Sequence, residues 1–235
     1  MTELSLAPFA QLSLACYDIS PAAQQAAVAA IPEMEWVASV GNPNHDCQAI
    51  LARWRGYSVI GFCGTRFSEG PIMGRIREDL DNLAIGPIKW GRGYCARGYG
   101  ERLLSVRDAI MPLVPGDTPI IGTGHSAGAP QAFLWALFMG GLNYQAIGFA
   151  GPHCADSECW AALYPTDSAI TQVVRERDVF FDWPPLLWDH PRRDFVWLRN
   201  GTILNVANRP GLNLSETDHD PALYVKDCLA LLATA

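Results

Sequence analysis

Residues 119 to 128 read Pro119-Ile-Ile-Gly-Thr-Gly-His-Ser-Ala-Gly128, a short apolar run that passes directly into a glycine-rich turn. The next stretch, Gln131 to Met139, is apolar nearly all round, which predicts a helix inside the protein. The turn matches the pattern G-x-S-x-G, and a strand before it with a helix after it is the context of a nucleophile elbow. The stretch therefore predicts a strand-turn-helix unit of an α/β fold, with Ser126 as the candidate nucleophile.

Strand and helix patterns alternate on both sides of this unit. Ser20 and Pro21 are a cap and a first helical residue for a helix within residues 18–30. Asn200-Gly201 is a strong signal for a hairpin with a type I′ turn. Alternation followed by a late hairpin predicts a mostly parallel sheet flanked by helices. The other expected elements are strands at 57–62, 119–122, 146–150, 170–174, 195–198 and 202–206, and a helix at 95–111 with Leu103, Leu104, Val106, Ile110 and Met111 roughly on one side.

Composition describes a globular chain without an electrostatic reason to bind nucleic acid. The 235 residues are 49% hydrophobic and 17% charged, with a formal net charge of −7, whereas nucleic-acid-binding proteins concentrate lysine and arginine on one face. No repeat, low-complexity tract or linker divides the chain, so residues 1–235 are expected to form a single domain. The paired arginines are interpreted as solvated strand or helix edges: Arg75 and Arg77, Arg175 and Arg177, Arg192 and Arg193.

The chain carries no recognisable export or membrane signal. Its N-terminus lacks a basic segment followed by an apolar one, and no run of about 18 apolar residues occurs. A soluble, cytoplasmic protein is expected. Seven cysteines at irregular spacing predict free thiols, and Cys154 and Cys159 with His153 match no zinc pattern. Neither a metal nor an organic cofactor is expected.

The glycine-rich turn also admits a different interpretation. Gly122-x-Gly124-x-x-Ala127 fits the dinucleotide fingerprint, but that fingerprint needs an acidic residue about 20 positions later, and none occurs from Thr118 to Ala155. Acyl chemistry on Ser126 is therefore favoured over nucleotide binding, and over a serine that only caps a helix. A second match, Gly91-x-Gly93-x-x-Ala96, is interpreted as a loop.

Further segments resemble the class 3, or fungal-type, lipases of the α/β-hydrolase superfamily. The elbow is similar to the family's G-H-S-L-G, and the resemblance covers roughly residues 55–225. Its other segments, which follow the family's order, are Phe62-Cys-Gly-Thr65 for F-R-G-[ST], Gly148-Phe-Ala-Gly-Pro-His153 for F-G-x-P-R, Asp178-Val-Phe-Phe-Asp-Trp-Pro-Pro185 for D-x-V-P-x-L-P-P, His190 with Asp194-Phe-Val-Trp197 for H-x-G-x-E-V-W, and Asp218-His219 with Tyr224 for D-H-x-x-Y.

The resemblance implies a role for each catalytic group. Because the hydrolase order is serine, acid, histidine, His45 and His125 are excluded as the base, and His153 and His190 remain competitors of His219. The family pattern makes His190 a structural residue of the hairpin and His219 the base. Asp178 is favoured as the orienting acid by its spacing to the prolines. The other candidates for the acid are Asp182, Asp189 and Asp194.

The oxyanion donors implied by the resemblance are the backbone N–H of Ala127 and the backbone and hydroxyl of Thr65. The sequence departs from the family in having Cys63 where arginine is usual and Ala129-Pro130 where small residues are usual; Pro130 suits the first turn of a helix. Residues Arg66 to Ile76 stand where the family has a mobile lid, and a short lid, a substrate-lining loop and a plain surface loop all fit them.

The implied function is hydrolysis of lipid-like acyl esters through an acyl-enzyme on Ser126. The expected partners are a small-molecule or lipid ester and, transiently, a lipid surface. An acyltransferase or thioesterase with the same three residues is the nearest alternative, because acyl-enzyme chemistry differs only in the acceptor. A catalytically silent binding protein on the same fold is a third.

Overall fold

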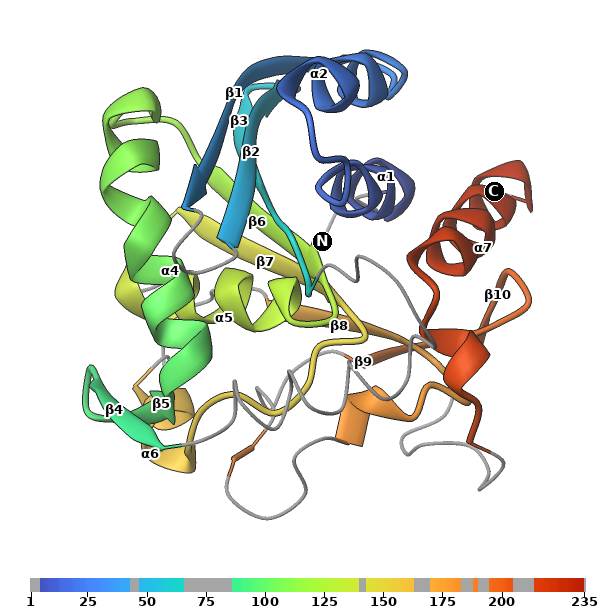
Figure 1. Ribbon diagram of the computed structural model, residues 1–235. Coiled ribbons are helices and arrows are strands. Elements are labelled where there is room, and N and C mark those ends of the chain that lie inside the picture. The colour runs from blue at the N-terminus through green and yellow to red at the C-terminus, as the bar shows by residue number, and fades with distance from the viewer. Residues whose placement is uncertain are drawn as a thin grey trace.

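The structure is a computed structural model, and its central feature is a sheet between two layers of helices (Figure 1). Within the described residues, eight strands form this sheet in the order β1-β2-β3-β6-β7-β8-β9-β10, and β4 and β5 form a separate hairpin. The strands are β1 Met34–Asn42, β2 Cys47–Trp54, β3 Tyr57–Phe62, β4 Pro87–Trp90, β5 Gly93–Ala96, β6 Ile120–His125, β7 Tyr144–Phe149, β8 Ile170–Arg175, β9 Phe195–Arg199 and β10 Thr202–Leu204. The structure describes residues 5–42, 47–65, 86–139, 143–162, 170–182, 188–189, 195–204 and 214–234.

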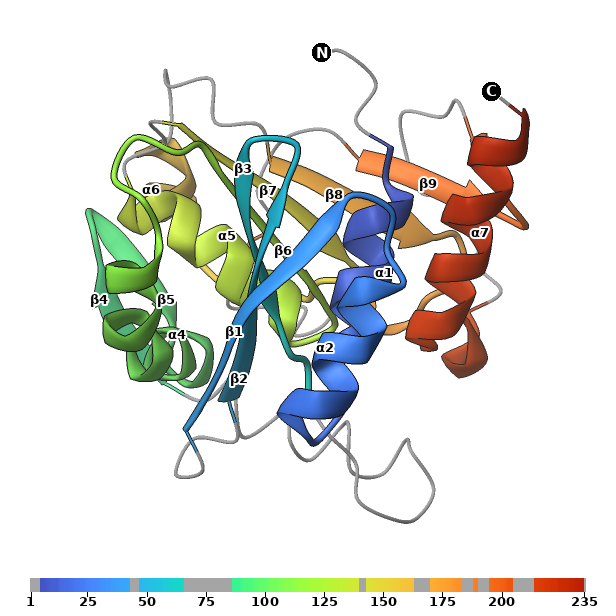
Figure 2. The same cartoon turned by 90° about the horizontal axis from the view of Figure 1, so that it is seen from above.

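Helices cover both faces of the sheet. The helices are α1 Ala7–Ala15, α2 Pro21–Ala29, α4 Arg97–Ile110, α5 Gly128–Phe138, α6 Ser157–Ala161 and α7 Pro221–Thr234, with short 3-10 turns η1 Met111–Leu113, η2 Phe180–Asp182 and η3 Glu216–His219. The view from above places α4 and α5 on one side of the sheet and α1 and α7 on the other (Figure 2). Alternate residues of each central strand therefore face different helices.

Two apolar cores follow from this arrangement. Ile60 and Phe62 of β3 pack into the core beneath α4 and α5, whereas Val59 packs into the core beneath α1 and α7. Strand β6 is buried along its whole length, as a strand covered on both faces must be. The sheet thus holds the ends of β3, β6, β7 and β8 in a rigid frame.

The parallel part of the sheet runs from β3 to β9. Each neighbouring pair in that run is parallel, and the β1-β2, β2-β3 and β9-β10 pairs are antiparallel. The prediction of a mostly parallel sheet with a late hairpin is confirmed. Asn200 and Gly201 both have positive φ, 47° and 76°, as a type I′ turn requires.

Other local predictions are confirmed in part. Helix α2 begins where expected, and the Ser20 hydroxyl accepts a hydrogen bond from the Ala23 N–H. Helix α4 buries Leu103, Val106 and Ile110, but Leu104 and Met111 are exposed, so the expected apolar side was too wide.

Two interpretations were wrong. The Gly91-x-Gly93-x-x-Ala96 segment is not a loop but the turn and second strand of the β4-β5 hairpin, in which Gly91 has a φ of 57°. Arg175 is not a solvated strand edge; it is 8% exposed because buried carboxylates surround it. Arg75, Arg77, Arg192 and Arg193 lie outside the described residues. None of the described helices combines the length and the apolar character that crossing a bilayer requires.

Candidate active site

Ser126 occupies the turn between β6 and α5. Its φ is 55°, a left-handed conformation that is strained for a residue with a side chain, and such strain is common where a nucleophile is held on a sharp strand-to-helix turn. Both glycines of the motif are sterically required. A Cβ on Gly124 would lie 2.4 Å from the carbonyl carbon of Gly128, and a Cβ on Gly128 would lie 2.2 Å from the carbonyl oxygen of Phe62.

Main-chain hydrogen bonds hold the elbow. The Ser126 N–H donates to the Phe149 carbonyl at 2.9 Å, and the Ser126 carbonyl accepts from the Ala129 N–H at 3.1 Å. The side chain of Gln131 donates to the carbonyls of Cys63 and Ala127, which joins the end of β3 to the first turn of α5. The turn is therefore held in place by contacts with β3 and β7 as well as by its own strand, β6.

The base candidate from the sequence lies against Ser126. His219 is the last residue of η3, just before Pro221 starts α7, and its Nε2 is 2.8 Å from Ser126 Oγ. Its ring packs against Phe180 and His125, with ring centroids 4.4 and 4.7 Å away. The imidazole is thus oriented by packing on both sides as well as by its hydrogen bonds.

Asp178 completes the arrangement from the loop after β8. Its Oδ2 and Oδ1 lie 3.0 and 3.1 Å from His219 Nδ1, and the carboxylate is 0% exposed. It also accepts hydrogen bonds from the Phe180 N–H at 2.9 Å and the Tyr224 hydroxyl at 2.8 Å. A buried carboxylate with this many donors is stabilised as the anion.

The ionisation of Asp178 follows from these contacts. Burial alone raises the pKa of Asp178, but the adjacent His219 and the hydrogen bonds from His219 and Tyr224 outweigh burial, so the pKa lies below its ordinary value. Burial and the Asp178 charge raise the pKa of Tyr224 well above the usual value, which keeps its hydroxyl as a donor. The Tyr224 hydroxyl in turn accepts the Arg175 N–H at 3.0 Å.

His125, the residue before Ser126, has a different environment from His219. Its Nδ1 is 2.9 Å from the Tyr17 hydroxyl, and the ring is buried. Burial lowers the pKa of His125 well below its usual value, and the neighbouring His219 lowers it further. His125 is therefore a neutral packing partner of His219.

The end of β3 borders the elbow. Phe62 pairs with Gly124, and a Cβ on Gly64 would lie 2.6 Å from the His125 carbonyl oxygen and 2.1 Å from the Tyr17 hydroxyl. Thr65, which follows, is 3% exposed, and its hydroxyl has no hydrogen-bond partner among the residues that the structure describes. Ala127, the N-cap residue of α5, is fully buried. The two residues expected to supply oxyanion donors thus follow the carboxyl-terminal ends of β3 and β6, which are neighbours in the sheet.

Among the competing candidates, the structure brings His219 rather than His153 to Ser126. Asp189 is exposed; its N–H donates to the Ala155 carbonyl, and its carbonyl accepts the indole N–H of Trp160. The side chain of Asp182 is not described, and His45, His190, Asp194 and the segment 66–76 lie outside the described residues. Within the described chain, no group of three or more histidine, cysteine or acidic side chains is placed to hold a metal, and Cys154 and Cys159 are buried free thiols.

Sequence reasoning missed two parts of this site. Tyr17 follows α1, more than 100 residues before His125, and nothing in the sequence around it predicts that contact. Tyr224 was included in the family pattern but without a role. It lies five residues after His219, two more than in the family pattern D-H-x-x-Y, so the spacing gave no signal of its contact with Asp178.

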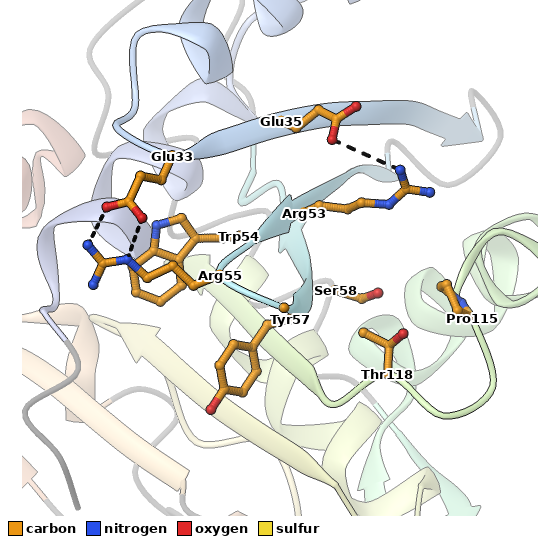
Figure 3. A pocket seen from close by; sticks show the side chains of 10 residues that line it. Glu33, Glu35, Arg53, Trp54, Arg55, Tyr57, Ser58, Pro115 and Thr118 are labelled. Atoms are coloured by element: carbon orange, nitrogen blue, oxygen red, sulfur yellow. Dashed lines mark hydrogen bonds and ion pairs between the residues drawn. The ribbon is translucent and has the colours of Figure 1, made fainter.

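A cavity of about 330 Å³ lies elsewhere, at the turn between β2 and β3 (Figure 3). It is at the opposite end of β3 from Thr65. Its charged side chains already pair with one another: Arg55 Nε donates to Glu33 at 3.0 Å, and Arg53 lies 4.0 Å from Glu35. This cavity contains none of the residues of the serine site.

Comparisons with known proteins agree with the architecture. No protein-family model matches the chain, and no curated protein matches it by sequence. Solved structures do match: lipase II from Rhizopus niveus has a TM-score of 0.69 at 17% identity, covering 90% of each chain. The chain has the fold of the fungal lipases.

Other structures with the lipase fold give the same result. A triacylglycerol lipase whose structure is described as having a serine protease triad at its catalytic centre matches with a TM-score of 0.70 at 18% identity, covering 91% of each chain. Lip2 lipase from Yarrowia lipolytica matches with a TM-score of 0.65 at 13% identity, covering 91% of this chain and 86% of that one. The expected resemblance to fungal-type lipases is confirmed at the level of the fold.

Proposed function

We propose that this protein is a serine ester hydrolase in which Ser126, His219 and Asp178 act as the catalytic triad. The observation that carries the proposal is the unbroken chain of hydrogen bonds from Ser126 Oγ through both nitrogens of His219 to Asp178. Nucleophile, base and orienting acid must stand in this order for a serine to attack a carbonyl carbon. A serine that only capped a helix would not need a base 93 residues away in the sequence.

In the proposed cycle, His219 Nε2 takes the Ser126 proton while Oγ attacks the ester carbonyl carbon. Asp178 keeps the proton on Nδ1, so Nε2 is free to accept, and it stabilises the imidazolium that forms. The tetrahedral intermediate collapses, the C–O bond to the alcohol breaks, and His219 gives its proton to the leaving alcohol. Water then attacks the acyl-enzyme, again losing a proton to His219; the bond to Oγ breaks, His219 returns the proton to Ser126, and the carboxylic acid is released.

The oxyanion is proposed to be held by the Ala127 N–H and by Thr65. The Ser126 N–H is unsuitable because it already bonds to Phe149, whereas Ala127 is at the start of α5, where free N–H groups and the helix dipole favour negative charge. The Thr65 hydroxyl is buried without a partner among the described residues, a costly condition that an oxyanion would relieve.

Acyl esters of lipid-like character are the proposed substrates. The structures that share the fold are named as lipases, and one is named as a triacylglycerol lipase. Ser126 is 4% exposed, so the reacting carbonyl must enter a largely enclosed site. This favours a flexible acyl chain over a bulky, rigid acid.

A p-nitrophenyl ester series of increasing acyl length tests the proposal. Wild-type protein should release p-nitrophenol, and Ser126→Ala should lose about 10⁶-fold of kcat while keeping its fold, because the nucleophile is removed. Hydrolysis that is equal in both proteins, or absent from folded wild type for every chain length, would refute the proposed function. Transfer of the acyl group to an added alcohol faster than to water would instead identify an acyltransferase.

A further inference from the structure

Arg175 is a buried arginine at the end of β8, three residues before Asp178. Its Nη1 lies 2.7 Å from Asp227 Oδ2, and its Nε lies 3.7 Å from Asp218 Oδ2. Its main-chain carbonyl accepts the Asp178 N–H at 3.0 Å. One residue therefore contacts the loop of the acid and, through its guanidinium, two carboxylates on the segment that carries the base.

The two segments that Arg175 joins are far apart in the chain. Asp218 directly precedes His219 in η3, and Asp227 lies on α7, which begins two residues after His219. The 2.8 Å contact between His219 and Ser126 depends on where η3 and α7 rest against the sheet. Nη1 of the guanidinium donates a hydrogen bond to Asp227, whereas Nε is too far from Asp218 for a hydrogen bond and acts on it by charge.

The charge of Arg175 matters as much as its geometry. Three charged or titratable groups lie against or beside His219: Asp178 after β8, His125 at the end of β6, and Asp218 beside it in η3. Tyr224 of α7 contacts Asp178 and His125. Negative charge near an imidazole favours its protonated form. Arg175 balances Asp218 and Asp227, so Asp178 remains the carboxylate whose charge acts on the base.

We propose that Arg175 is a positioning residue, which joins the His219 segment to the Asp178 loop and neutralises Asp218 and Asp227, so that Asp178 is the carboxylate whose charge acts on His219. The inference rests on the proposed ester hydrolysis. It goes beyond the three catalytic residues because Arg175 contacts neither Ser126 nor the reacting atoms and acts through Asp218, Asp227 and Asp178.

The test compares pH profiles of kcat/KM for wild type and three variants on one p-nitrophenyl ester. Arg175→Gln should move the midpoint of the acid limb upward by about 0.5 to 1 pH unit, since two carboxylates lose their counter-charge. Asp227→Asn should move it downward, and Arg175→Lys, which keeps the charge, should stay near wild type. KM should change little in all three, because the altered groups do not contact the substrate.

Arg199→Gln is the matched control. Arg199 forms an ion pair with Glu176, the residue after Arg175; the Arg199 side chain is half exposed, so solvent screens its charge. Its acid limb should coincide with that of wild type. If the role of Arg175 were purely structural, Arg175→Gln and Arg175→Lys would both lose activity. The midpoint of the acid limb would then not depend on the charge at position 175.

A second readout does not need turnover. In a Ser126→Ala background, NMR titration of the His219 imidazole should give midpoints in the order Asp227→Asn, wild type, Arg175→Gln. Equal His219 midpoints in all three proteins would overturn the proposal. If Arg175→Gln does not fold, a midpoint in Asp227→Asn equal to that of wild type would overturn it. If wild type hydrolyses no ester, the proposed function fails while the NMR order still decides the role of Arg175.

Discussion

Replacing Tyr224 by phenylalanine removes one hydroxyl that serves two buried partners. The hydroxyl donates to Asp178 Oδ2 at 2.8 Å and accepts the Arg175 N–H at 3.0 Å, and the residue is 1% exposed. A hydrogen bond to a charged acceptor contributes about 1.5 to 3 kcal/mol, and a buried N–H left without a partner costs about 1 to 3 kcal/mol. Because the two effects share one site and do not add fully, we expect Tyr224→Phe to lower the free energy of unfolding by about 2 to 4 kcal/mol.

Tyr144→Phe is the control for this prediction. Tyr144 is similarly buried, and within the described residues its hydroxyl donates to one neutral acceptor, the Ala132 carbonyl of α5, so its loss should cost about 1 kcal/mol. Urea unfolding of both variants measures the difference, provided that the m-value stays constant. Tyr224→Phe should also lower kcat, which Tyr144→Phe should not. Equal destabilisation by the two variants, with kcat unchanged in both, would refute the role assigned to Tyr224.

Substitutions at three further residues test separate parts of the account. Gly128→Ala should abolish activity and lower stability by several kcal/mol, roughly the cost of overpacking, since its Cβ would meet the Phe62 carbonyl at 2.2 Å; a fully active variant in an ester assay would contradict the elbow geometry. Thr65→Val should lower kcat by about 10²-fold and Thr65→Ser much less, because only serine keeps a hydroxyl donor, and equal rates would remove Thr65 from the oxyanion site. The pKa of His125 is lowered in the folded state. Below about pH 6.5 the unfolded chain therefore binds a proton at His125 that the folded chain does not bind, and the free energy of unfolding falls by up to about 1.4 kcal/mol per pH unit. Urea titrations from pH 7.5 to 5 should show a shallower fall for His125→Gln, and identical slopes would disprove the assignment.

The sequence predicted best those elements whose signals are local. Asn200-Gly201 requires two positive φ angles, and the cap at Ser20 with Pro21 marks a helix start, so both appear where expected. The elbow was predictable because tight packing around Gly124 and Gly128 leaves little choice of residue.

Helix α1 and strand β1 were not predicted, for identifiable reasons. Helix α1 begins at Ala7 without a side-chain cap, although Pro8 lies in its first turn, and it is apolar on nearly every side, so it has no polar face to mark it as a surface helix. Strand β1 has a register shift between Trp36 and Ala38, which interrupts the alternation that marks a strand. Both elements are defined by tertiary packing rather than by local pattern.

Ser126, His219 and Asp178 were named from the sequence, and the structure brings them into contact, but their catalytic roles stay predictions. The burial of Arg175 could not be foreseen, because an arginine is buried only when partners are present, and Asp227 lies 52 positions later. The order of motifs in the sequence indicates which residues meet; it does not indicate which charges are balanced around them.

Mapping a fluorophosphonate adduct by mass spectrometry tests the central claim most directly. This reagent reacts with a serine only when a base activates it, so labelling reports the nucleophile independently of the natural substrate. The account predicts one adduct, on the peptide that contains Ser126, absent from Ser126→Ala and strongly slowed in His219→Ala. An adduct on a different residue, or no adduct on folded wild-type protein, would contradict it.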